Sequence, residues 1–225
     1  MKGELFYPDI RTRRQMQGVL KNPRAKCPNE FYYMYRDSAV KYDCKIFHKH
    51  GLRYDITVLP AFKCMDEFNK TFGHFHSIVP KTKLTYPEVY EVLRGKAIYL
   101  LQNEFEFIAI RAKKGDKVLV PPGYGHVTVN NSPKETLVMA NIMALASKSD
   151  YGNYKKRRGA AYYYTTSGFV KNKKYKKIPK IKFKKPTKNS EFGLTENTIY
   201  KEFLLHPKRF DWLVRPQKYD FIDFL

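Results

Sequence analysis

The sequence has few cysteines and no pair of them at the spacing of a redox or zinc motif. Its three cysteines, Cys27, Cys44 and Cys64, are an odd number, and no two of them form a C-x-x-C pattern. A disulfide framework is typical of secreted chains with an even cysteine count. We therefore expect reduced thiols, as in a cytoplasmic protein.

Long apolar runs are also missing. No segment approaches the roughly 18 apolar residues that a membrane-spanning helix requires. The chain begins Met1-Lys2-Gly3-Glu4-Leu5, so charged residues stand where a signal peptide would have its apolar region. These absences predict a soluble cytoplasmic protein with no membrane partner.

Acidic residues are scarce relative to basic ones. The chain has 43 Lys and Arg against 21 Asp and Glu, and residues 171–188 hold ten lysines and no acid. Lysines that neutralise phosphates bind nucleic acids, but no zinc-finger, helix-turn-helix or RNA-recognition signature accompanies this charge. We expect no nucleic-acid partner and interpret the lysines as a solvated surface that attracts small anions.

Aromatic residues are abundant, with 18 Tyr and 16 Phe, which is typical of packed sheet rather than disorder. From residue 53 onward, short apolar segments alternate with turns that contain Gly, Pro or Asn. The expected strands cover residues 54–59, 70–78, 89–93, 96–102, 105–111, 117–120, 127–130 and 136–143. Many short strands without an intervening helical period predict an all-β sandwich or barrel.

The length of 225 residues suits one domain. We expect a single domain over 1–225, with a barrel core at about 53–145, an N-terminal arm at 1–52 and a C-terminal extension at 165–225. The arm is predicted to contain a short helix near 11–21. The extension is predicted to contain a helix within 194–206, capped by Thr195 and stopped by Pro207. Its last apolar residues are expected to pack on the barrel or on a partner subunit: Phe210, Trp212, Leu213, Phe221, Ile222, Phe224 and Leu225.

Three histidines and a glutamate form the strongest functional motif. His74 and His76 are two residues apart, so both point to the same face of a strand. Glu88 begins a later apolar strand, and His126 follows a Pro-Pro-Gly turn. Three imidazoles and one carboxylate suit a divalent metal such as Fe, Mn, Ni or Zn, and they leave positions open for water or substrate. An unpaired buried glutamate would be costly, so we interpret the four as metal ligands rather than as hydrogen-bonded core residues.

A second H-x-H pattern occurs at His48 and His50. No carboxylate follows it at a comparable offset in a strand, and its neighbours are Lys49 and Gly51. We interpret it as the solvated end of a hairpin.

The segments Gly73-His74-Phe75-His76, Glu88 and Pro122-Gly123-Tyr124-Gly125-His126 resemble the cupin signature. This resemblance implies a double-stranded β-helix, a jelly-roll barrel with the metal inside. More narrowly, T-x-G-H-x-H joined to E-V-Y-x-V-L-x-G is similar to the cupin-type glucose-6-phosphate isomerases of archaea and some bacteria. The similarity covers most of the chain and is carried by residues 33–36, 54–58, 70–76, 86–95, 100–102, 121–130, 150–152 and 158–163.

The resemblance implies a metal-dependent isomerase of glycolysis and gluconeogenesis that interconverts glucose 6-phosphate and fructose 6-phosphate. It makes His74, His76, Glu88 and His126 the ligands of one metal per subunit. The residues do not choose among the metals; we expect Fe²⁺, with Mn²⁺, Ni²⁺ or Zn²⁺ as alternatives. The family resemblance also implies a homodimer.

The same resemblance suggests a substrate pocket. Its residues would be Thr57, Thr71 and Gly73 around the phosphate, Tyr90 and Tyr151 along the wall, and Tyr35 and Arg36 as further phosphate candidates. We assign Glu88 and Tyr151 to catalysis. Of the two routes open to an aldose–ketose isomerase, proton transfer through an enediol and hydride shift, we favour the enediol route with Glu88 as proton carrier.

The chain departs from the family pattern at two positions. Short archaeal members carry a tyrosine near the end of the strand that here ends at Met143, and a histidine just before D-Y-G, where this chain has Ser149. A proton relay through those groups is therefore not carried over. The loop 77–87 is also longer than the usual cupin spacing. Two other functions stay open: another metal cupin enzyme, such as a sugar-phosphate epimerase or dioxygenase, and a non-catalytic sugar-binding cupin.

Overall fold

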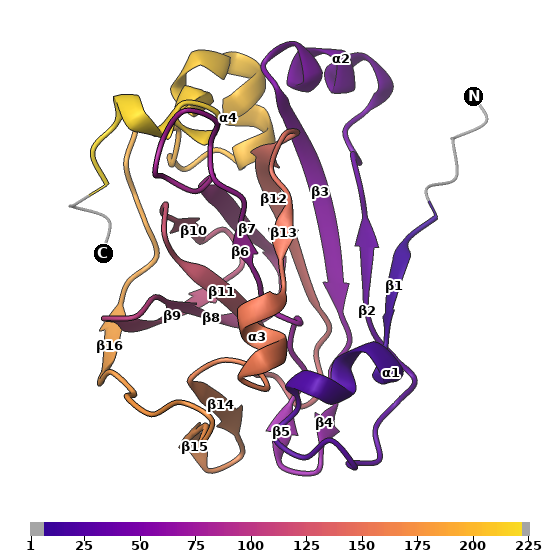
Figure 1. Ribbon diagram of the computed structural model, residues 1–225. Helices are drawn as coiled ribbons and strands as arrows, with labels where there is room; N and C mark the ends of the chain where they lie inside the picture. The colour runs from indigo at the N-terminus through magenta and orange to yellow at the C-terminus, as the bar shows by residue number, and fades with distance from the viewer. Residues whose placement is uncertain (1–6, 222–225) are drawn as a thin grey trace.

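The computed structural model describes residues 7–221 of the chain (Figure 1). The strands are β1 Asp9–Thr12, β2 Glu30–Tyr35, β3 Leu52–Leu59, β4 Lys63–Cys64, β5 Glu67–Phe68, β6 Phe75–His76, β7 Glu88–Arg94, β8 Lys96–Gln102, β9 Phe107–Lys113, β10 Lys117–Val120, β11 Gly125–Asn130, β12 Leu137–Ala144, β13 Ser149–Asp150, β14 Tyr162–Thr165, β15 Gly168–Lys171 and β16 Ile181–Lys184. The helices are α1 Arg13–Met16, α2 Lys41–Lys49, α3 Gly152–Lys156 and α4 Ile199–Leu205, with 3₁₀ turns at Gln17–Val19, Pro207–Leu213 and Pro216–Lys218. None of the helices within residues 7–221 is both long and apolar enough to cross a bilayer.

Two sheets enclose the main core. The first has the order β1-β2-β3-β12-β7-β10 and the second the order β11-β8-β9-β16. Side chains from both sheets meet in one hydrophobic cluster, in which Val92 and Met139 of the first sheet join Leu100 and Val127 of the second. All six residues of β11 are buried, as expected for a strand whose two faces are covered. The all-β jelly-roll expectation is confirmed.

The register of the first sheet determines which side chains point into its interior. Strand β12 pairs with β3 on one side and with β7 on the other. Because residues directly opposite each other share a face, two rows of side chains form on the inner surface. The rows are Arg53–Met143–Glu88 and Asp55–Asn141–Tyr90.

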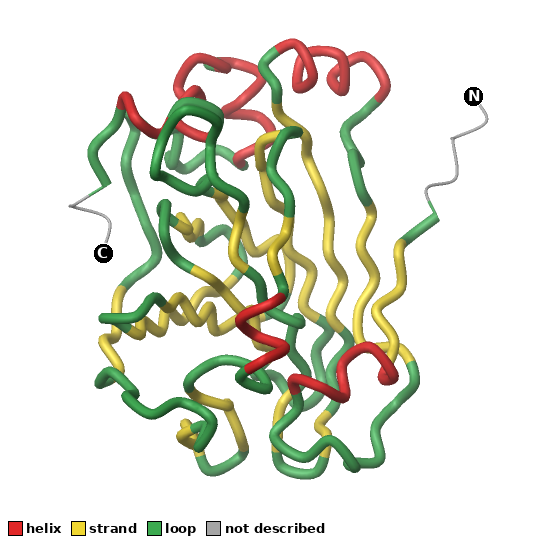
Figure 2. The backbone as a smooth tube through the Cα atoms, viewed as in Figure 1, coloured by secondary structure: helices red, strands yellow, loops and turns green. Residues whose placement is uncertain are grey.

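Helical segments gather at the ends of the strands, and α2 and α4 lie together at the upper end in Figure 2. There they form a second hydrophobic cluster with the first sheet, in which Phe47 stacks on Phe203 at 4.1 Å between ring centroids. Phe210 and Trp212 are fully buried in this cluster. The prediction that the C-terminal apolar residues pack on the barrel is confirmed for the described residues; Ile222, Phe224 and Leu225 lie outside them.

Several element boundaries differ from expectation. The helix predicted near 11–21 is helical only from Arg13 to Val19, because Asp9–Thr12 pairs with β2 as a strand. The strand predicted at 70–78 is reduced to Phe75–His76 and isolated bridges, since the positive φ of Gly73 interrupts it. Helix α4 is capped by Thr198, whose side chain accepts a hydrogen bond from the amide of Lys201. Thr195 is therefore not the cap; its hydroxyl donates to Glu202 instead.

Two predictions about small motifs were wrong. Cys27 and Cys64 form a disulfide, and only Cys44 is free. The arm passes beside β4, a proximity that spacing along the chain could not reveal. His48 lies in helix α2 rather than at a hairpin end. In a helix, residues two apart point in different directions, so His48 and His50 have separate surroundings.

Candidate metal centre

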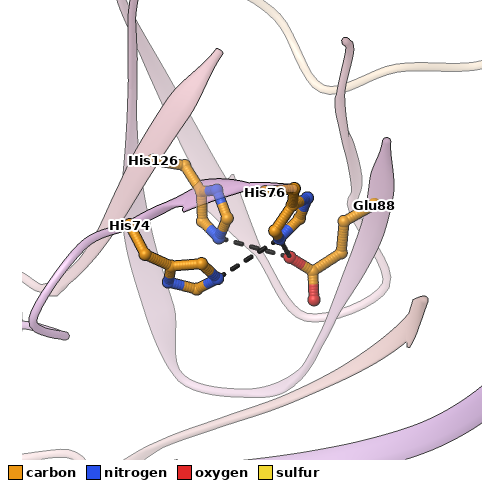
Figure 3. Close-up of side chains that lie close together, drawn as sticks. All are labelled: His74, His76, Glu88 and His126. Atoms are coloured by element: carbon orange, nitrogen blue, oxygen red, sulfur yellow. Dashed lines mark hydrogen bonds and ion pairs between the residues drawn. The ribbon is translucent and has the colours of Figure 1, made fainter. Parts of the chain in front are cut away.

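The three histidines and the glutamate converge inside the barrel (Figure 3). His76 lies in β6 with His74 just before it, Glu88 opens β7 and His126 lies on β11. The main chains of His74 and His126 form an antiparallel bridge that joins two of these segments. Nε2 of His76 lies 3.2 Å from Nε2 of His74 and 3.2 Å from Oε2 of Glu88, and Nε2 of His126 is also 3.2 Å from that oxygen. The structure thus brings together the four predicted ligands.

Gly73 explains how His74 reaches this position. Its φ of +84° belongs to the left-handed region that favours glycine. A Cβ at this position would lie 2.5 Å from Cγ2 of Val127 and 2.8 Å from the ring of Tyr154. Glycine therefore permits both the backbone turn and the close approach of the His74 segment to β11.

Neighbouring groups orient the ligand atoms. Nδ1 of His76 lies 2.7 Å from the carbonyl oxygen of Tyr86, so it donates there and leaves Nε2 free to face the centre. The amide of Asn141 donates to Oε1 of Glu88 at 2.7 Å, and the hydroxyl of Tyr90 donates to Oε2 at 2.9 Å. Both Glu88 oxygens are therefore held in place.

The pKa shifts of three of the four residues favour the protonation states that ligands need. Burial lowers the pKa of His74 well below its ordinary value and also lowers the pKa of His126. Burial opposes ionisation of Glu88, but its hydrogen bonds to His126 and His76 hold its pKa well below the usual range. Burial likewise opposes protonation of His76, yet the hydrogen bond and charge of Glu88 raise its pKa.

A divalent metal fits this donor set. Two neutral imidazoles and an ionised carboxylate surround one point, and a cation there would replace the proton that Glu88 favours on His76. Nδ1 of His126 is buried and lacks a hydrogen-bond partner among the described residues, whereas its Nε2 faces the centre. Nitrogen and oxygen donors of this kind suit Fe, Mn, Ni or Zn without choosing among them.

A cavity adjoins the metal centre. Its wall includes five residues predicted to form the substrate pocket, namely Thr57, Thr71, Gly73, Tyr90 and Tyr151. Arg36, which directly follows β2, also lines it, whereas Tyr35 does not. The two positions that depart from the family pattern, Met143 and Ser149, lie on the same wall.

Sequence reasoning missed an ionic cluster on this wall. Asp55 is fully buried and accepts hydrogen bonds from Nη1 of Arg36 at 2.8 Å and from Nε of Arg53 at 3.1 Å. Arg53 also donates from Nη2 to the sulfur of Met143 at 3.2 Å. A guanidinium thus lies beside Met143, near the end of β12. The sequence feature that could have indicated this cluster is Asp55, an aspartate inside the apolar segment 54–59.

A third arginine, Arg11, contacts two residues of the cavity wall, Tyr32 and Tyr151. The guanidinium of Arg11 lies 5.4 to 5.8 Å from the ring centres of Tyr32, Phe72 and Tyr151, and its Nη2 donates to the hydroxyl of Tyr151 at 3.4 Å. Three guanidinium groups and one buried carboxylate therefore surround this side of the cavity. The arrangement gives the cavity a positive field that favours an anionic ligand.

Comparison with known proteins yields a family match. The family model described as "Glucose-6-phosphate isomerase (GPI)" matches residues 10–180. A glucose-6-phosphate isomerase of Thermococcus litoralis is 39% identical over 102 residues, which cover 45% of this chain and 50% of that protein. One of Pyrococcus furiosus is 35% identical over 130 residues, covering 56% of this chain and 66% of that protein. The matched segments thus span between half and two thirds of these relatives.

Proposed function

The chain belongs to the cupin-type glucose-6-phosphate isomerase family, and from this premise we propose that it interconverts glucose 6-phosphate and fructose 6-phosphate with a bound divalent metal. One observation carries the proposal. Three of the four metal-ligand candidates, His74, Glu88 and His126, line the same cavity as Thr57, Thr71 and Gly73, two hydroxyls and a glycine amide that can surround a phosphate. The positive wall around Asp55 supports the same class of substrate.

The cavity must open to admit a hexose phosphate. Its volume of about 50 Å³ holds only a few water-sized groups. The Arg11 guanidinium and the ring of Tyr151, a wall residue, pack against each other and are half-buried, so they are the side chains we expect to move. Displacing Arg11 from the rings would also free its charge for the phosphate.

The chemistry of isomerisation moves a proton between C2 and C1 and another between O1 and O2. We assign the carbon-to-carbon transfer to the Glu88 carboxylate, which takes the proton from C2 and returns it to C1 through an enediol. The hydroxyl of Tyr90 stays protonated, because burial and the charge of Glu88 raise its pKa well above the ordinary value. Once released from Oε2 of Glu88, this hydroxyl can donate its hydrogen bond to the oxygen on which negative charge develops.

His74, His76, Glu88 and His126 would hold the metal, which supplies a Lewis acid for the carbonyl oxygen of the open-chain sugar. Tyr151 remains our second catalytic assignment. Its hydroxyl contacts Arg11 and its ring lies 5.4 Å from that of His74, so it borders both the cavity and the metal centre.

The substrate assignment is tested by following fructose 6-phosphate by NMR in the presence of the metal-loaded protein. We expect glucose 6-phosphate to form, and unphosphorylated fructose to react far more slowly. Consumption of oxygen, or epimerisation without glucose 6-phosphate, would instead support another metal cupin enzyme. Complete retention of a C2 label at C1, with none lost to solvent, would contradict the enediol route.

The remaining expectations are part of the same proposal. We propose one domain over 1–225, an Fe²⁺ cofactor, a homodimer that light scattering can test, and a cytoplasmic location. The Cys27–Cys64 disulfide removes one of the arguments for that location, which was the expectation of reduced thiols.

A further inference from the structure

A second cluster of metal-ligating side chains lies away from the barrel cavity. Cys44 and His48 are four residues apart on helix α2, so both side chains face the same side of the helix. Asp37, from the turn before the helix, meets them there. Nε2 of His48 lies 2.7 Å from Oδ2 of Asp37, and Sγ of Cys44 lies 3.3 Å from that oxygen and 3.5 Å from that nitrogen. The three atoms form a small triangle.

These separations resemble those between the ligands of a tetrahedral zinc ion. Zinc bonds of about 2.3 Å to sulfur and about 2.0 Å to nitrogen or oxygen place neighbouring ligand atoms roughly 3.3–3.6 Å apart. The two separations that involve Sγ of Cys44 already lie close to this range. The separation between His48 and Asp37 must lengthen by roughly 0.5 Å to reach it. The side chains of Asp37 and His48 are 34% and 43% exposed, so both can adjust and a fourth ligand can come from solvent.

A catalytic relay does not explain the cluster. In a nucleophile–histidine–aspartate relay, the nucleophile and the carboxylate contact different ring nitrogens. Here Cys44 and Asp37 both approach Nε2 of His48. Three donors that face one point are the arrangement that a bound cation requires.

The backbone holds Asp37 in this position at some cost. Its φ of +51° is uncommon for a residue with a side chain. Its amide donates to Oδ1 of Asp55 at 2.9 Å, which fixes the turn against the wall of the barrel cavity. Oδ1 of Asp37 is buried and has no hydrogen-bond partner among residues 7–221. The other oxygen, Oδ2, faces Cys44 and His48, so the carboxylate is only partly satisfied by the residues around it.

We propose that Asp37, Cys44 and His48 form a second metal site, which binds one Zn²⁺ ion with a water molecule as its fourth ligand. A thiolate, an imidazole and a carboxylate suit zinc, and three protein ligands leave one position open. The site is independent of the proposed isomerase activity, because it shares no ligand with the barrel centre.

Cobalt titration of the full-length protein under non-reducing conditions tests this site. Cobalt bound by a thiolate shows an ultraviolet charge-transfer band, and the barrel centre contains no sulfur ligand. We expect a band whose final intensity corresponds to one thiolate-bound ion per chain, that zinc abolishes by competition, and that Cys44→Ala removes. The His48→Ala variant should weaken cobalt binding at this site at least tenfold.

His50→Ala is the matched control, since His50 belongs to the same H-x-H pattern but its ring packs edge-on against Phe203. This variant should keep the band. Absence of the band in the wild-type protein, or its persistence in Cys44→Ala, would overturn the proposal. Thermal unfolding of each metal-free variant shows whether a lost band reflects the loss of a ligand or the loss of the fold. Asp37→Asn is a further variant that removes a ligand.

Discussion

Glu88 shows how one side chain can serve both as ligand and as proton carrier. Oε1 is held by Asn141, and Oε2 faces two histidines and the Tyr90 hydroxyl. We predict that Glu88→Gln lowers kcat/KM for fructose 6-phosphate at least ~100-fold, because it removes both the charge and the proton acceptor. Steady-state kinetics with metal analysis of each sample measure this loss.

Glu104→Gln is the control for Glu88→Gln, since Glu104 is exposed in the turn between β8 and β9 and should tolerate the change. Loss of activity at unchanged metal content would assign Glu88 mainly to proton transfer, and loss of both would assign it mainly to ligation. Wild-type activity in Glu88→Gln would contradict both roles.

Thr57 tests the phosphate pocket separately. Valine has nearly the same shape as threonine but lacks the hydroxyl. Because a hydrogen bond to a charged group contributes about 1.5–3 kcal/mol, we predict that Thr57→Val raises KM for fructose 6-phosphate at least ~10-fold and changes kcat little. Metal content should equal that of the wild-type protein. An unchanged KM would place the phosphate elsewhere, with the Arg36 and Arg53 wall as the next candidate.

At the scale of elements, two glycines next to metal-ligand segments form a matched pair. Gly73 and Gly123 have φ values of +84° and +86°, so an alanine meets similar backbone strain at either position. A Cβ at Gly73 would clash with Val127 and Tyr154, whereas a Cβ at Gly123 has nothing within 4 Å. We predict that Gly73→Ala lowers the free energy of unfolding by about 1–3 kcal/mol more than Gly123→Ala does, and that only Gly73→Ala lowers metal content.

Denaturant unfolding of the two variants, with metal analysis, measures this difference. Equal losses of stability would mean that Val127 and Tyr154 move aside without cost. The comparison needs no estimate of the backbone strain itself, because that strain is common to both variants.

Elements with a strong local signal could be predicted from the sequence. The β7–β8 hairpin followed from Arg94-Gly95, and Gly95 indeed has a positive φ of +83°. Strand β16 did not follow, because its alternating Ile181 and Phe183 lie among lysines and it pairs with β9 in parallel, a partner distant in the sequence. Helix α2 was missed for a similar reason: its apolar residues Phe47 and Ile46 are few, and Phe47 gains its burial from α4.

The residues around the barrel cavity also divide into those that could be predicted from the sequence and those that could not. The histidines and Glu88 could be predicted because ligand spacing follows the two-residue period of a strand. Arg53 and Asp55 could not be assigned, because their roles depend on the pairing of β3 with β12, which places Arg53 opposite Met143. The Asp37–Cys44–His48 cluster required both a helix and the turn before it, neither of which was expected.

At the scale of the whole molecule, one covalent link joins the N-terminal arm to the barrel. The Cys27–Cys64 disulfide spans 37 residues of sequence. Closing a loop of this size stabilises the folded state by roughly 3–4 kcal/mol in the chain-entropy description. We predict that reduction, or Cys27→Ser, lowers the free energy of unfolding by this amount, whereas Cys44→Ala has a much smaller effect.

Thiol titration of the protein unfolded without reductant provides the direct count. One reactive thiol per chain, from Cys44, is the expected result, and three after reduction. Three thiols before reduction would mean that the two cysteines are not linked in the isolated protein.

The central claim is that one metal ion, held inside the barrel by His74, His76, Glu88 and His126, is required for sugar-phosphate isomerisation. The most direct measurement is a coupled assay of glucose 6-phosphate formation on the same sample as purified, after chelation and after metal is restored. We predict that activity falls with metal content and returns on adding Fe²⁺ or another divalent first-row ion. Full activity in protein shown by elemental analysis to be free of metal would contradict the account.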